Sequence, residues 1–266
     1  MKFVHILSRI TGTPWLILED ALENITLLIE SRIAGLALQP MNTPAVAPPQ
    51  SRREGNAAII PIHGVIGKKL SPMEMACGGA DVDAISASLD AAVADPAVQR
   101  IILDIDSPGG QVTGVPELAN KIARARDTSG KTITARSDTV IGSAAYWLAA
   151  SAHEIHVTPT TQVGSIGAAL TVRETIDNKS ADGRTRLRVF RSGADKLPGA
   201  DGPLTEQQAA AAQKRVDHIG ALFRDHVAAS RPRVKPESMT GSAFHGTEAH
   251  ARGLVDSVSD TLSAAA

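Results

Sequence analysis

Hydrophobic positions follow two alternating periods along most of the chain. Ile85, Leu89 and Val93 recur at helical spacing and predict a helix over 82–94. Residues 99–105 are apolar throughout the centre of the run, which is typical of a strand covered on both faces. The other expected strands are 57–62, 132–135, 154–157, 254–258 and a run around Val189, and the other expected helices are 115–125, 143–152 and 204–229. This alternation predicts an α/β fold with a largely parallel sheet and helices around it.

The N-terminal part has a different pattern. Residues 14–36 predict a helix, with Pro14 near its start and an apolar stripe behind it. Residues 39–55 contain four prolines and few bulky apolar groups, which is the composition of a linker. The expected organisation is an N-terminal helical appendage (1–38), a Pro-rich linker (39–55), a main domain (56–260) and a tail (261–266).

Composition and charge exclude several classes of protein. With 43% hydrophobic residues in 266, the chain can bury a large core. Its net charge of −1 gives no basic excess, so nucleic-acid binding is not expected. Arg184, Arg186 and Arg188 alternate with apolar residues, which indicates the solvated face of a half-buried strand. The alternative is a basic rim for an acidic partner.

Cysteine content and apolar run lengths indicate the compartment. Cys77 is the only cysteine, so no intramolecular disulfide forms, and no metal site is expected. The apolar stretches before Glu19 and Asp20 are too short for a signal peptide. No run approaches the roughly 18 apolar residues of a membrane span. We therefore expect a protein of the cytoplasm with no membrane partner.

Two short motifs carry candidate chemistry. Asp106–Gly110 follows a predicted strand, and Gly109-Gly110 lets the backbone turn sharply and present N–H groups that could hold an oxyanion. The alternative is an ordinary turn before a helix. Ser143 follows Gly142 at a predicted helix start, where a serine is either an N-cap or a nucleophile. As a nucleophile it would use the Ala144 N–H as a second oxyanion donor.

A serine nucleophile needs a base. His153 would lie about three turns along the same helix, too far from Ser143, and His156 is in the following strand. We interpret both histidines as structural or exposed. Lys196 lies between a predicted strand and the long helix. Most lysines are solvated surface charges, but burial lowers the pKa of a lysine and allows it to act as a general base.

Four motifs in register resemble the S49 peptidase family, which includes signal peptide peptidase A and the capsid-maturation peptidases of tailed phages. They are Asp106–Gly110, Gly142–Ala144, Val163–Gly167 and Ser192–Lys196, and the resemblance covers roughly residues 56–260, including the closing stretch 244–256. It implies a Clp/crotonase-like α/β fold with repeated ββα-type units. It also implies roles for five residues: Ser143 as nucleophile, Lys196 as general base, Gly110 and Ala144 as oxyanion donors, and Ser165 as a hydrogen-bond partner of the lysine.

The same resemblance favours a Ser–Lys dyad and the phage branch of the family. Clp peptidases use Ser-His-Asp, but the segment 163–169, where their histidine falls, has no His here. Thr13–Leu16 with the helix behind it is similar to the N-terminal region of prophage capsid peptidases. Since the chain stops at Ala266, any scaffold is expected to be a separate protein or absent.

The expected function is thus that of a serine endopeptidase for head maturation, located in the host cytoplasm or the procapsid. It would cleave scaffold or capsid proteins, form a homo-oligomer, and need no metal or other cofactor. Three alternatives remain open at this stage: a signal-peptide-peptidase-like cytoplasmic peptidase, a crotonase-like enzyme for CoA thioesters, and a non-catalytic capsid-assembly protein.

Overall fold

A six-stranded sheet forms the centre of the structure, a computed structural model that describes residues 14–21, 23, 49–71, 74–75, 78–170 and 205–262. Its strand order is β13-β10-β8-β6-β3-β2, and every pair is parallel except β2 with β3. The strands are β2 (Arg52–Glu54), β3 (Ala57–His63), β6 (Arg100–Asp106), β8 (Thr132–Ser137), β10 (Glu154–Val157) and β13 (Ser257–Val258). This sheet confirms the predicted α/β class.

The central strands are held by burial on both faces. β6 pairs with β3 from Arg100 to Asp106 and with β8 from Arg100 to Asp104. Ile101, Ile102 and Leu103 in its centre have no solvent exposure. Burying each such side chain contributes about 1.5–3 kcal/mol relative to exposure. The continuous apolar run predicted for this segment is therefore explained by a strand with helices or strands on all sides.

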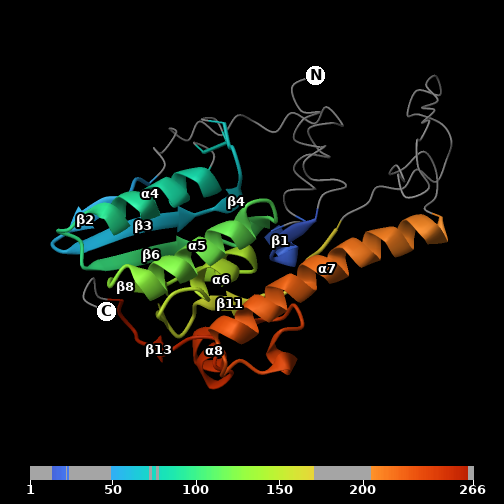
Figure 1. Cartoon of the computed structure of the whole chain (residues 1–266). Coiled ribbons are helices and arrows are strands. Elements are labelled where there is room, and N and C mark those ends of the chain that lie inside the picture. Colours follow the sequence, from blue (N-terminus) through green and yellow to red (C-terminus); the bar gives the residue numbers. More distant parts are fainter. Residues whose placement is uncertain are drawn as a thin grey trace, which may run out of the picture.

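Helices α4 (Val82–Ala94) and α5 (Val115–Thr128) cover the sheet, as Figure 1 shows. The N-cap of α4 is Asp81, whose carboxylate accepts from the N–H groups of Asp83 and Ala84. α7 (Glu206–Ser230) begins with a capping box formed by Thr205 and Gln208. Because such caps satisfy N–H groups that have no partner within the helix, they fix where each helix starts. The helices predicted over 82–94, 115–125 and 204–229 are confirmed.

α7 is bound to the rest of the molecule near its C-terminal half. Phe223 stacks on Trp147 of α6 (Ala144–Ala149), with 4.4 Å between ring centroids and 4° between ring planes. Gly220, Phe223 and Val227 are its only buried residues. The helix is followed by a 3-10 turn, η1 (Pro236–Ser238), and by α8 (Gly246–Ala251). Among the described helices, none has the length and apolar character needed to cross a membrane.

Two smaller sheets lie beside the central one. The first has the order β1-β7-β4-β5, and the second has the order β12-β11-β9. Their strands are β1 (Trp15–Ile17), β4 (Val65–Gly67), β5 (Gly79–Asp81), β7 (Gly109–Gln111), β9 (Val140–Gly142), β11 (Gln162–Gly164) and β12 (Ala243–His245). These short strands contain the glycines of the predicted motifs, and Ser143 and Ser165 directly follow β9 and β11.

The structure corrects several element boundaries, and the helix predicted over 143–152 is limited to α6 (Ala144–Ala149). Residues 14–36 were expected to be one helix, but Trp15–Ile17 form strand β1, and helical residues begin only at Glu19. β1 pairs with β7, so these residues belong to the sheets of the main domain rather than to an appendage. Within the predicted linker, Arg52–Glu54 form β2. The strand predicted over 254–258 is limited to Ser257–Val258, and Leu254 and Val255 lie buried in the preceding loop.

Some predictions fall outside the described residues. They are residues 24–36 of the predicted helix, residues 39–48 of the predicted linker, Cys77, the arginines at 184, 186 and 188, the strand around Val189, and Lys196.

Candidate active site

Ser143 lies at the junction between β9 and α6, in a backbone conformation that few residues adopt. Its φ is 47° and its ψ is −108°. A non-glycine residue with positive φ stores about 1–3 kcal/mol of strain, and such residues cluster at functional sites. The conformation is held by a 2.7 Å hydrogen bond from the Ser143 N–H to the Gly164 carbonyl, and by the following helix, whose residues are all buried.

The side chain of Ser143 does not act as a helix cap. Although the residue occupies the N-cap position of α6, it makes no side-chain cap hydrogen bond. Its Oγ instead donates to the Gly167 carbonyl oxygen at 3.4 Å, a long and therefore weak interaction. The residue is only 1% exposed. The N-cap interpretation is therefore wrong for the side chain, and the hydroxyl is left available for other chemistry.

The two predicted motifs come together in space. The Gly142 N–H donates to the Ser107 carbonyl at 2.9 Å, and the Ser107 N–H donates to the Val140 carbonyl at 3.1 Å. These bonds join the turn containing Gly109-Gly110 to the residue that precedes Ser143. A Cβ on Gly110 would lie 2.0 Å from the Ile66 carbonyl oxygen, so only glycine fits between β7 and β4.

Ala144 is the other predicted oxyanion donor. It is the first residue of α6, and its side chain is fully buried. The N–H groups of the first helical turn have no acceptor within their own helix, so the Ala144 N–H is directed out of the helix start. A backbone N–H at a helix start is of the kind that stabilises developing negative charge.

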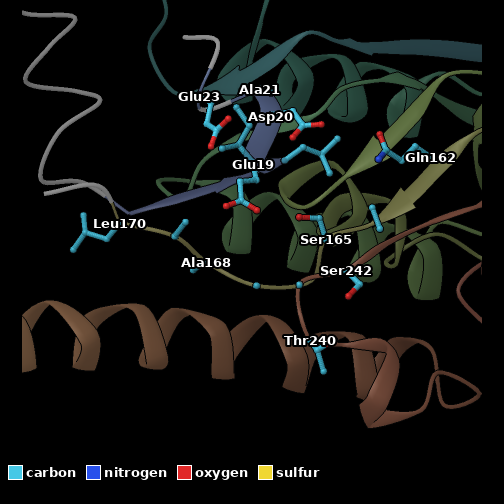
Figure 2. Close-up of a pocket in the computed structure, with 16 residues that line it drawn as sticks. Glu19, Asp20, Ala21, Glu23, Gln162, Ser165, Ala168, Leu170, Thr240 and Ser242 are labelled. Carbon is cyan, nitrogen blue, oxygen red and sulfur yellow. The ribbon is translucent and has the colours of Figure 1, made fainter. Parts of the chain in front are cut away.

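Ser165 lies directly after the Gly164 carbonyl that holds Ser143. It too has a positive φ, 55°, and its N–H donates to the Ser242 carbonyl at 2.8 Å. Ser165 lines a cavity of about 1300 Å³. Figure 2 shows this cavity bordered by the N-terminal segment with Glu19 and Asp20, by Ala168 and Leu170, and by Thr240 and Ser242.

The histidines near the site in sequence have structural contacts, as predicted. His153 Nδ1 lies 3.0 Å from the Ile133 backbone N–H, which donates to it. His156 Nδ1 lies 2.6 Å from Ser257 Oγ at the edge of the central sheet. In the part of the chain that the structure describes, no three His, Cys, Asp or Glu side chains gather as a metal site would require.

A serine–histidine pair elsewhere in the molecule was not predicted from the sequence. Ser151 Oγ lies 2.8 Å from His226 Nε2, and the two residues are 75 positions apart. Ser151 is fully buried, and burial lowers the pKa of His226. The contact joins α7 to the turn that follows α6, and Ser151 Oγ also donates to the Trp147 carbonyl at 3.4 Å, so we interpret this pair as structural.

Comparison with known proteins assigns the family. The sequence model of Peptidase family S49 matches residues 125–266, which is more than half of the chain. The chain belongs to peptidase family S49. The resemblance seen in the sequence is thereby confirmed. The S49 match includes Ser143 and Ser165, whereas Gly110 lies before it and is connected to the site by the Ser107–Gly142 hydrogen bond.

Two curated relatives come from phages. The chain is 31% identical over 213 residues to the head-tail preconnector protein GP5 of Enterobacteria phage P21, covering 77% of this chain and 42% of that protein. It is 29% identical over 253 residues to the capsid assembly protease C of Escherichia phage lambda, covering 93% and 56% respectively. The S49 chain therefore spans about half the length of these relatives.

A solved structure, a ClpP1 variant from Listeria monocytogenes, has 13% sequence identity and a TM-score of 0.45. The similarity covers 76% of this S49 chain and 91% of that one.

Proposed function

We propose that this chain is a serine endopeptidase with Ser143 as its nucleophile. The observation that carries the proposal is the strained Ser143 backbone at a strand-to-helix turn, combined with an Oγ that does not cap the helix. A serine that is required only as a cap would point its Oγ at the helix N–H groups. Membership of peptidase family S49 supports the same reaction class.

The proposed reaction is acyl transfer. Ser143 Oγ attacks a peptide carbonyl carbon while a base takes its proton, and the Gly110 and Ala144 N–H groups hold the oxyanion. The tetrahedral intermediate collapses when the amine leaves with a proton from the same base, and water then hydrolyses the acyl-enzyme. The family resemblance supports neutral Lys196 as that base and Ser165 as the group that orients it.

The substrates that this proposal favours are capsid or scaffold proteins of a phage head. Its support is the similarity to the two phage relatives, a capsid assembly protease and a head-tail preconnector protein. We further propose that the protein acts as a homo-oligomer in the host cytoplasm or the procapsid. Cleavage of signal peptides in place of capsid protein would favour the signal-peptide-peptidase alternative.

Replacement of the nucleophile tests the proposal. Ser143→Ala should lower cleavage of casein or capsid protein by at least about 1000-fold. Since the Ser143 side chain makes no cap bond, the urea midpoint should change little. Ser151→Ala is the matched control, because Ser151 is a buried serine beside a histidine, and it should keep its activity and its labelling by fluorophosphonates.

The alternatives give different results. A folded Ser143→Ala chain that still acts on a CoA thioester would favour the crotonase-like enzyme. A wild-type chain that no serine-reactive probe labels in any assembly state would favour the non-catalytic assembly protein.

The base is tested separately. Lys196→Arg should be inactive, because a guanidinium does not deprotonate at working pH. Wild-type activity should rise with pH as the lysine loses its proton. Lys214→Arg on the exposed face of α7 is the control for the charge-conserving change. An active Lys196→Arg enzyme would place the base elsewhere.

A further inference from the structure

β1 lies between two backbone segments that border Ser143. On one side it pairs antiparallel with β7, where Leu16 is in register with Gly110. On the other side Trp15 and Ala169 exchange two hydrogen bonds, of 2.8 and 2.9 Å. Ala169 is two residues from Gly167, whose carbonyl accepts from Ser143 Oγ. The same two segments therefore hold the proposed catalytic groups and β1.

The backbone of β1 faces the proposed oxyanion donor. Peptide groups alternate in direction along a strand, and those of Trp15 point toward Ala169. The Leu16 groups therefore point toward β7, and the Leu18 N–H donates to the Pro108 carbonyl at 2.9 Å. A Cβ built on Gly109 would lie 2.1 Å from the Leu16 carbonyl oxygen. A carbonyl of this chain thus rests against Gly109-Gly110, where a substrate carbonyl would have to bind.

β1 also reaches the residue before the nucleophile. A Cβ on Gly109 would be 3.0 Å from both the Gly142 carbonyl oxygen and Ile17 Cα. A Cβ on Gly142 would lie 3.0 Å from Leu18 Cγ. Without β1, β7 would be the edge strand of its sheet, next to Ser143. An open strand edge of this kind binds extended peptides by main-chain hydrogen bonds.

We propose that Trp15–Leu18 is an internal occupant of the peptide-binding cleft, and that this segment has to leave before a substrate strand can pair with β7. The proposal rests on the proposed function of Ser143. The occupant also indicates the substrate class. Trp15, Leu16 and Ile17 are 4%, 0% and 5% exposed, so the cleft accommodates an extended segment with consecutive apolar side chains. The charged residues Glu19 and Asp20 follow Ile17 and Leu18, and all four line the cavity.

A variant that weakens β1 should open the site. Leu16→Ala removes buried contacts of β1 without touching the proposed catalytic groups. We expect Ser143 to react with a fluorophosphonate about tenfold faster or more, because the population with an open cleft rises. Arg53→Ala in β2, another three-residue edge strand, should stay within twofold of the wild-type rate. A folded Leu16→Ala chain that reacts no faster than wild type would overturn the proposal.

A second measurement uses the wild-type chain and so does not depend on the folding of a variant. An apolar tripeptide fluorophosphonate attached to Ser143 should fill the cleft and expel β1. Hydrogen exchange should then rise at least about tenfold at residues 15–18 and at the Ala169 amide. Diisopropyl fluorophosphate, which carries no peptide, should leave their protection unchanged. Full labelling by the tripeptide reagent with β1 still protected would contradict the proposal.

The two hypotheses fail differently. If Ser143 reacts and the enzyme cleaves protein but β1 neither moves nor affects the rate, only the occupant proposal is wrong. If Ser143 is unreactive in both the wild-type and Leu16→Ala chains, the proposed function is wrong and the occupant proposal falls with it.

Discussion

β1 and β2 are both three-residue antiparallel strands at the edge of a sheet, yet they have opposite character. Every residue of β1 is buried and apolar, whereas every residue of β2 is exposed and charged. β2 pairs with β3 through Arg52–Glu54 and ends the central sheet on that side. Charged edge strands of this kind prevent further strand pairing. β1 instead brings apolar side chains to an edge beside Ser143.

The difference in burial and charge indicates different roles for the two edge strands. A purely protective strand needs no buried side chains, because charge alone discourages pairing with other chains. The buried side chains of β1 indicate a site that accepts apolar chain segments, and this is the basis for treating β1 as an occupant. Three measurements compare the two strands, beginning with the largest expected effect.

Glycine substitutions beside each strand should separate the two edges most clearly. Gly109→Ala places a Cβ 2.1 Å from the Leu16 carbonyl oxygen at a φ of 108°. Strain and overpacking together should lower the free energy of unfolding by about 2–6 kcal/mol. Gly55→Ala in the β2–β3 turn also has a positive φ, 61°, but meets nothing within 4 Å, so about 1–2 kcal/mol is expected.

Urea denaturation of both glycine variants measures the contrast. Equal losses would mean that β1 moves away from Gly109 at no cost, and the close contact with β1 would then contribute nothing to stability.

The sequence predicted the long elements of the central sheet because their patterns are strong. β6 is a continuous apolar run, and α4 has apolar residues at helical spacing with Asp81 as its cap. β1 was missed because its three apolar residues, placed just before a helical stretch, fit a helical pattern equally well. What makes Trp15–Ile17 a strand is pairing with residues about 95 and 150 positions away, which no local pattern contains.

The geometry of the candidate site also depends on long-range contacts that local sequence patterns do not contain. Glycine and serine motifs indicated Gly110 and Ser143, and the family resemblance gave them roles. The direction of Ser143 Oγ, away from the helix N–H groups, depends on a φ that Gly164 and the β9–β11 pairing impose. The Ser151–His226 pair was missed because neither residue lies in a motif, and their contact depends on how α7 docks.

Side-chain truncation within the strands should give the second largest contrast. Ile17→Ala removes a side chain that is only 5% exposed, and such a change costs about 2–5 kcal/mol. The loss of stability should make hydrogen exchange at least about 30-fold faster at the Ala169 amide, which donates to the Trp15 carbonyl. Arg53→Ala loses only an exposed 3.6 Å ion pair with Asp95, so exchange across β2–β3 should change about twofold or less. Comparable changes at both edges would remove the distinction between the strands.

The smallest expected difference between the two edges is in the pH dependence of stability. This dependence should appear near β2 and not at β1. His63 at the end of β3 lies 3.6 Å from Asp104 on β6, whose other oxygen accepts from Arg136 at 2.8 Å. The contact with Asp104 raises the pKa of His63, and Asp106 raises it further, while burial and Arg52 of β2 oppose the rise. The same contact with His63 lowers the pKa of Asp104 to about 2.

The signs of these shifts fix the pH window. The contribution of His63 to stability is complete below its unfolded pKa near 6.5 and is lost as the pH rises through the raised folded value. The contribution of Asp104 is present above 3.8 and is lost only as the pH falls through about 2. Because the His63 side chain is 35% exposed, solvent screens the pair, and the loss above neutral pH should be less than about 1 kcal/mol.

Urea midpoints measured from pH 5 to 9 should show this loss in the wild type and not in His63→Gln. No titratable group lies within Trp15–Ile17, so exchange at β1, corrected for its intrinsic pH dependence, should not follow the same curve. A His63→Gln chain with an unchanged pH profile would mean that the midpoint reports another group, and the charged contacts beside β2 would then contribute nothing measurable to its edge.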